Sequence, residues 1–185
     1  MESIATVIKF SKSKGACGEA ISWLRTQNDA EHAWLTCERP DWMIWYVRRR
    51  GAEHKTLVRI ACDCARTALR FVPEGEDRPR LAIETTERWL IGEATIEEVR
   101  TARDAAAAAA AYDAAAAYAA AYAAYAAYAA YAADDAAAYA AYASAAAYAA
   151  AADDAAAARR QANIQMCNIV RKHISYQDIA LPASA

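Results

Sequence analysis

The chain has 185 residues, five cysteines and a formal charge of −2, and its length suits one folded domain rather than two. A charge so close to neutral gives no general attraction to nucleic acid or to an anionic membrane. The odd cysteine count, the lack of a disulfide-scaffold spacing and a start without a signal-peptide core predict a cytoplasmic protein with free thiols. Six aspartates interrupt the long alanine-rich segment, so we expect no membrane span.

The first fifty residues predict short elements separated by turns. Residues 2–10 carry a β-favouring apolar run, which indicates a short extended arm. We expect a first helix over residues 19–27 and a short turn around residues 33–35. Pro40 fits the first turn of the next helix, which ends at Gly51.

Two further helices are expected before the composition changes. Apolar residues at spacings of three and four predict a helix over residues 53–71. Residues 72–79 read as a loop, and the next helix is expected over residues 80–91. A capping box at Thr95 and Glu98 then predicts a helix that begins near residue 96.

The segment from residue 104 to residue 158 contains only alanine, tyrosine, aspartate and one serine. Alanine is the best helix former, so this segment should be helical. One helix over residues 96–175 would be about 120 Å long, whereas a compact domain of this size is about 40–45 Å across. We therefore expect breaks at the aspartate pairs 134–135 and 153–154, because aspartate caps helices.

These patterns predict an all-α, single-domain bundle of about seven helices. The domain covers residues 1–185, with a mixed-composition half at 1–95, an Ala/Tyr-rich half at 96–175 and a tail at 176–185. The Ala/Tyr-rich half should form long antiparallel helices. Whether the chain is a monomer or a dimer stays open, as does the possibility that the Ala/Tyr segment is an expanded repeat.

Four tyrosines of this segment form a candidate binding surface. Tyr122, Tyr125, Tyr128 and Tyr131 are spaced by three, so they wind about halfway round a helix and cannot all face one core. Tyrosine contributes large contact area at low entropic cost, which favours a protein-binding role for those that are exposed.

The residues that could carry chemistry show no recognisable catalytic, metal or cofactor motif. Cys62 and Cys64 flank Asp63, but residues two apart on a helix point in different directions and cannot readily share one metal ion. The three histidines are not at a helical ligand spacing, and no glycine-rich loop is present to hold phosphate. We therefore expect no enzyme activity, no metal and no cofactor.

Trp42, Trp45 and the run Arg48, Arg49 and Arg50 form a second candidate binding site. Cations beside aromatic rings suit nucleic acid or an acidic partner. The alternative is a helix whose tryptophans face inward and whose terminal arginines complement the helix dipole.

A third group of residues is expected to be structural. Arg78 and Arg80 follow a loop that has to be fixed where two helices meet, and we expect them to bond to acidic groups of neighbouring helices, with Asp63 and Glu84 as candidates. The structural set contains Asp63, Asp77, Arg78, Arg80, Glu84 and Trp89.

Several of these motifs resemble a known family. The stretches RIACDCARTAL (residues 59–69) and DRPRLAIE (residues 77–84), with Trp89 and Gly92 behind them, are similar to proteins usually labelled putative immunity proteins. An early Gly-Ala-Cys, a later Asp-Trp-x-x-Trp and the alanine-rich second half extend the resemblance over about residues 15–165. Such proteins occur near bacterial polymorphic toxins and in phage genomes.

The resemblance implies a helical, non-enzymatic protein that binds and neutralises a protein toxin or effector. It could be an immunity protein or a phage-encoded counter-defence inhibitor. The alternative from another class is a nucleic-acid-binding accessory protein that uses the arginines of residues 48–50 and the basic C-terminal helix.

Overall fold

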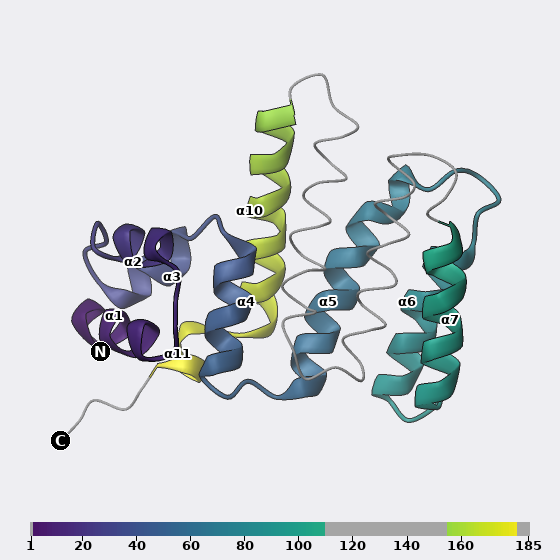
Figure 1. The fold of residues 1–185 in the computed structure, drawn as a ribbon, viewed down its shortest axis with the longest axis horizontal. Helices are drawn as coiled ribbons and strands as arrows, with labels where there is room; N and C mark the ends of the chain where they lie inside the picture. The colour runs from purple at the N-terminus through teal and green to yellow at the C-terminus, as the bar shows by residue number, and fades with distance from the viewer. Residues whose placement is uncertain (1, 110–154, 181–185) are drawn as a thin grey trace.

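The computed structural model describes residues 2–109 and 155–180, and every regular element within these ranges is a helix (Figure 1). The all-α class is therefore confirmed for this part of the chain. The elements are α1 (Ile4–Ser13), α2 (Gly18–Leu24), α3 (Ala30–Thr36), α4 (Pro40–Arg49), α5 (His54–Ala68), the 3₁₀ turn η1 (Leu69–Phe71), α6 (Arg78–Leu90), α7 (Ile96–Ala109), α10 (Ala155–His173) and α11 (Tyr176–Ile179).

The longer helices stand side by side in one row, in the order α4, α10, α5, α6 and α7 (Figure 1). The helix α10 lies between α4 and α5, although more than eighty residues separate it from either in the sequence. The short helices α1, α2 and α3 lie together beyond α4, and α11 returns the chain to the same end. We call α1, α2 and α3 the N-terminal unit.

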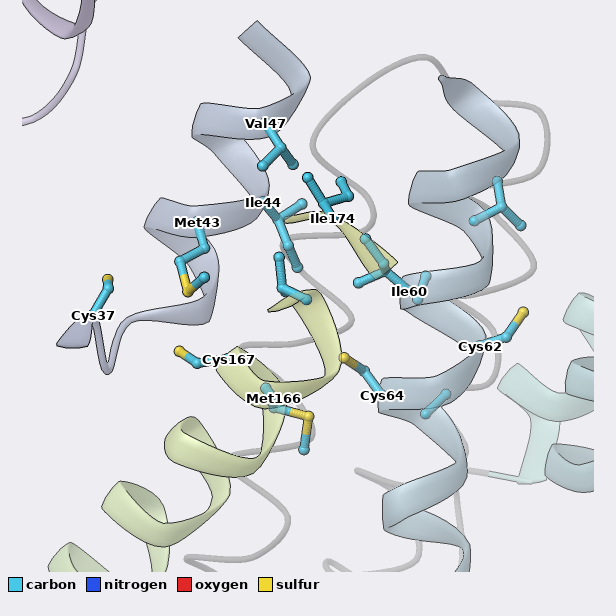
Figure 2. Packing of buried hydrophobic residues seen from close by; sticks show 14 of the residues in the cluster. Cys37, Met43, Ile44, Val47, Ile60, Cys62, Cys64, Met166, Cys167 and Ile174 are labelled. Carbon is cyan, nitrogen blue, oxygen red and sulfur yellow. The ribbon is translucent and has the colours of Figure 1, made fainter. Parts of the chain in front are cut away.

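The core runs along this row of helices, and its centre lies where α4, α10 and α5 meet (Figure 2). Ile44, Ile60 and Met166 are among its largest fully buried side chains. Further along the row, small residues such as Ala61 and Ala82 are fully buried in α5 and α6. Alanines at such positions allow close helix packing, and they leave no room for a larger side chain.

Local sequence signals set several helix boundaries as predicted. Pro40 occupies the first turn of α4, and Gly51 adopts a left-handed φ of 90° just after its end. The capping box is confirmed: the Glu98 backbone N–H donates to the Thr95 hydroxyl at 3.2 Å, and the Thr95 backbone N–H donates to the Glu98 carboxylate at 2.7 Å.

Two predictions for the N-terminal unit are wrong. Residues 2–10 do not form an extended arm, because most of them belong to α1, whose first turn is capped by the side chain of Ser3. Residues 33–35 do not form a turn, since they belong to α3, which the Asp29 carboxylate caps. In both places a serine or aspartate cap and apolar residues at helical spacing outweigh the β propensity of single residues.

Two other boundaries shift by a few residues. The predicted helix over residues 53–71 is α5 followed by η1, and α6 begins at Arg78, two residues before the predicted start. Pro79 lies in the first turn of α6, where a missing N–H costs nothing. The predicted breaks at residues 134–135 and 153–154 lie outside the described residues.

Candidate binding site

Three of the α4 residues predicted for binding share one side of the helix. Trp42, Trp45 and Arg49 follow one another at spacings of three and four, so they lie in one row. The Arg49 guanidinium is 5.8 Å from the Trp45 ring centre, and the Arg39 guanidinium is 4.3 Å from that of Trp42. Both distances are within the range of cation–π attraction. Arg49 is exposed, while both tryptophans are half-buried.

Arg50 has a different place from its two neighbours in the arginine run. Its side chain and that of Glu2 are each only 2% exposed, and its guanidinium donates to the Glu2 carboxylate at 2.5 Å. The same guanidinium donates to the Tyr46 hydroxyl and lies 4.2 Å from the Phe10 ring centre. Arg50 therefore fixes the N-terminal unit to α4, whereas Arg49 faces the solvent.

A cavity of about 530 Å³ lies between the N-terminal unit and α4. Four of the five tryptophans of the chain contribute to its wall. Trp23 of α2 and Trp42 of α4 stand with ring centres 5.9 Å apart and planes tilted by 52°. Small residues, Ala20 of α2 and Ala33 of α3 among them, complete much of the remaining wall. Most of the lining is thus apolar, and much of it is aromatic.

Few polar groups lie on this wall. Arg39 forms two hydrogen bonds with the Asp41 carboxylate and lies 3.6 Å from that of Glu19, so its charge is paired. Tyr176 of α11 reaches the wall from the other end of the chain and is only 7% exposed. Its buried hydroxyl has no hydrogen-bond partner among the described residues. Burial raises the pKa of this hydroxyl, which is therefore neutral at ordinary pH.

The cysteines of α5 are core residues. Cys64 points toward α10 and Cys62 points to the opposite side of α5 (Figure 2). Burial raises the pKa of both thiols, which keeps them protonated and unreactive. Among the described residues, no group of three histidine, cysteine or acidic side chains is placed to hold a metal ion.

The prediction that Asp63 bonds to Arg78 or Arg80 is wrong. Asp63 instead accepts a hydrogen bond of 2.8 Å from His173 and so joins α5 to α10. Arg80 does bond to Glu84, but both residues belong to α6, and its second partner is Asp77, just before that helix. Residues four apart on one helix face meet without any neighbouring helix.

Arg78 and Trp89 complete the set predicted to be structural. Arg78 bonds through its backbone and its side chain to Glu76 in the preceding loop. Trp89 is half-buried in α6, with its ring centre 6.3 Å from that of His54. The contacts of Arg78 and Arg80 with acidic groups thus hold the start of α6 locally.

The basic residues of α10 serve largely as contacts within the molecule. Arg171 donates to the backbone oxygens of Trp34 and Cys37, and so satisfies carbonyls at the end of α3. Arg160 forms two hydrogen bonds with Glu38, and the Lys172 ammonium is 3.9 Å from Asp63. Together with the buried Arg50, these contacts reduce the cationic surface that a nucleic acid would need.

Sequence reasoning missed the cavity. One signal could have indicated it: four of the five tryptophans fall within residues 23–45. Such a local concentration of large rings around small residues is more than a short helix pair needs for its own packing. The four tyrosines predicted for binding at residues 122–131 lie outside the described residues.

No helix in the described part of the chain is long and apolar enough to cross a membrane. The row of packed helices defines the class of the described part of the chain: an all-helical fold whose notable features are an aromatic cavity and an aromatic–cationic helix face.

Comparison with known proteins then gives the family. A model of the family described as "Imm-5 like putative immunity protein" matches residues 50–168, and the chain belongs to this family. The resemblance drawn from the sequence motifs is therefore confirmed, although the match begins later than the expected residue 15. No curated protein and no solved structure matches the chain. Because the match begins at Arg50, most of the cavity wall lies before the matched range.

Proposed function

We propose that this protein is a non-enzymatic binding protein that neutralises a protein effector. The effector is a toxin, for which this chain is the immunity protein, or a defence protein that a phage counters with this chain. Membership of the Imm-5 like putative immunity protein family supports this role. The observation that carries it is the row of Trp42, Trp45 and Arg49 on one side of α4.

This row has the composition of a protein-binding centre. Tryptophan and arginine are among the residues that most often contribute large binding energies at interfaces, and such residues cluster near the centre of a contact. Trp45 and Arg49 lie close together on α4, as members of such a cluster do. Their rings and aliphatic stems offer apolar area, and the guanidinium offers directed hydrogen bonds to a carboxylate.

The charge of this side of α4 indicates the chemistry of the partner. Arg49 is exposed, and Arg48 precedes it in the last turn of the helix. The charge of Arg39, in contrast, is balanced by Asp41 and Glu19. An acidic surface on the effector would complement the exposed Arg49, as electrostatic complementarity at interfaces requires.

Co-expression with any candidate toxin whose gene lies beside the gene for this chain tests the role as an immunity protein. The wild-type chain should restore growth and co-elute with the toxin as a complex. Growth arrest by every such toxin in the presence of the wild-type chain would refute the role as an immunity protein.

A pair of charge reversals tests the surface. Arg49→Glu places a like charge against an acidic partner and should weaken binding by at least about tenfold. Arg59→Glu makes the same change at an exposed position of α5 and should bind as the wild type does. Unchanged helical circular dichroism in both variants shows that they fold, so equal binding by both would exclude the α4 surface.

A further inference from the structure

The cavity between the N-terminal unit and α4 opens to the solvent beside the α4 row of Trp42, Trp45 and Arg49. Gly15 and Cys17 of its wall are exposed, and the two tryptophans of the row are half-buried. These tryptophans therefore belong both to the proposed effector surface and to the cavity wall. A partner that binds this side of α4 meets the opening of the cavity at the same time.

The cavity wall favours an apolar occupant. Tryptophan rings and small residues such as Ala20 and Ala33 form much of it. The acidic side chains nearby, Asp41 and Glu19, both contact Arg39, so each has a cationic neighbour within the protein. The volume of the cavity is about 530 Å³, and an apolar cavity of about 150 Å³ already holds a benzene ring. One large apolar side chain of a partner therefore fits into this space.

Exposed cations stand at the ends of two rows of wall residues. On α1, Val7 and Ser11 line the cavity, and Lys14 follows in the same row, because spacings of four and three keep residues on one helix face. On α4, Trp45 lines the cavity and Arg49 follows it in the same way. Both cations are exposed. A partner segment at the opening is therefore attracted if it is acidic.

We propose that the cavity receives one large apolar side chain of the effector, and that acidic residues before and after it in the effector segment contact Lys14 and Arg49. This contact rests on the proposed function, because the effector supplies the side chain, and it adds α1 and α2 to the surface that binds the effector. A few side chains buried in pockets near the centre of an interface contribute most of its binding energy, and complementary charges add specificity.

Two short peptides test the contact on the isolated chain, without any effector. One has a phenylalanine between two pairs of acidic residues, and the other has alanine in place of the phenylalanine. The first should bind at least about tenfold more tightly, because only its ring fills the apolar space. In NMR titrations the indole N–H signals of Trp23, Trp42 and Trp45 should shift. Trp89 on α6 is the internal control and should not shift. Equal binding of the two peptides, or binding of neither at millimolar concentration, would overturn the proposal.

Two pairs of variants locate the bound peptide. Ala20→Leu fills space at the wall and should weaken the binding of the phenylalanine peptide by at least about tenfold, whereas Ser22→Leu, at an exposed position of the same helix, should not. Lys14→Glu repels the acidic residues and should weaken binding several-fold. Lys9→Glu makes the same change on the opposite side of α1 and should weaken it much less. Equal binding within either pair, in variants with unchanged circular dichroism, would overturn the proposal.

Growth assays with a toxin separate this contact from the proposed function. A toxin that the wild-type chain neutralises should be neutralised less well by Ala20→Leu and Lys14→Glu than by their controls Ser22→Leu and Lys9→Glu. If all four variants protect as the wild type does, the contact is wrong and the proposed function stands. If the peptides bind as expected but the chain neutralises none of the toxins encoded beside its gene, the contact chemistry is supported and the role as an immunity protein is refuted.

Discussion

The row of long helices and the N-terminal unit differ in how they bury their side chains. In the part formed by α4, α10, α5 and α6, isoleucine, valine, alanine and cysteine side chains are fully buried. The N-terminal unit is attached to this part through large aromatic rings, a buried ion pair between Arg50 and Glu2, and a cavity. The first region maximises contact, whereas the second combines strong local contacts with unfilled space.

This difference indicates which region is free to take on a binding role. Close packing leaves a core no room for substitution or ligand, because even one added methylene group has to displace its neighbours. The N-terminal unit contains short helices whose packing is incomplete around the cavity. Residues of this unit can contribute to stability and still present an aromatic wall to the cavity. The predictions below test this contrast between the two regions.

Thiol reactivity should show the largest difference. Cys17 is exposed between α1 and α2 of the N-terminal unit, whereas Cys64 and Cys167 are buried in the core. Burial raises the pKa of the two core thiols, and a reagent reaches them only when the core opens. With a disulfide reagent at pH 8, Cys17 should react at least about a thousandfold faster, as followed by mass spectrometry. Comparable rates would mean that the core is not closed.

Replacing Arg50 should affect the free energy of unfolding much more than replacing its neighbour Arg49. Arg50→Ala leaves the Glu2 carboxylate buried without its cation and should lower the free energy of unfolding by about 3–5 kcal/mol. Arg49→Ala removes an exposed charge and should change it by less than about 0.5 kcal/mol. Urea denaturation measures both values. Equal losses in the two variants would mean that Arg50 does not hold the N-terminal unit in place.

A double substitution separates the charge from the packing. Glu2→Leu together with Arg50→Met removes both charges and keeps apolar volume at each site. Replacing both members of a buried ion pair is often neutral, so this variant should recover most of the stability that Arg50→Ala loses.

The contrast between Arg49 and Arg50 also shows which structural features could be predicted from the sequence. The helix α4 and both of its ends were predictable, because Pro40 and Gly51 act through local backbone geometry. The buried state of Arg50 was not, since it depends on Glu2, which is 48 residues away. A run of three arginines has the same local pattern whether its last member faces solvent or a carboxylate.

The same difference between local signals and long-range contacts explains which other features could be predicted. The capping box of α7 was predictable from Thr95 and Glu98 alone. The partner of Asp63 was not, because α10 reaches α5 only through the tertiary arrangement. The cavity needs α11 as well as the N-terminal unit, so Tyr176 could not be assigned to it from its sequence position.

A larger side chain should lower the free energy of unfolding in the packed region, but not at the cavity wall. Ala61 is fully buried in the packed region, and Ala61→Leu should lower the free energy of unfolding by about 1–3 kcal/mol through overpacking. Ala20 lies on the cavity wall, and Ala20→Leu should be neutral or stabilising, because the leucine gains apolar contacts without displacing neighbours. Thermal unfolding of both variants gives the comparison. A similar loss in Ala20→Leu would show that the cavity wall has no room to spare.

The smallest change in the free energy of unfolding is expected for Tyr176→Phe, and the sign of this change is more informative than its size. A tyrosine hydroxyl that is buried and bonded usually contributes stability, so its removal lowers the free energy of unfolding. The Tyr176 hydroxyl has no partner among the described residues, and burial without a hydrogen bond carries a cost. Tyr176→Phe should therefore leave stability unchanged or raise it by up to about 1 kcal/mol.

Tyr46→Phe is the matched control for this substitution. The Tyr46 hydroxyl accepts a hydrogen bond of 2.8 Å from Arg50, and losing this acceptor should cost about 1–3 kcal/mol, because the bond involves a buried charge. Urea denaturation of the two variants side by side removes any general effect of replacing tyrosine by phenylalanine. A loss at Tyr176 equal to that at Tyr46 would show that the Tyr176 hydroxyl is bonded in the folded protein. Opposite signs at the two tyrosines would instead show that the Tyr176 hydroxyl is buried in the folded protein without a hydrogen-bond partner.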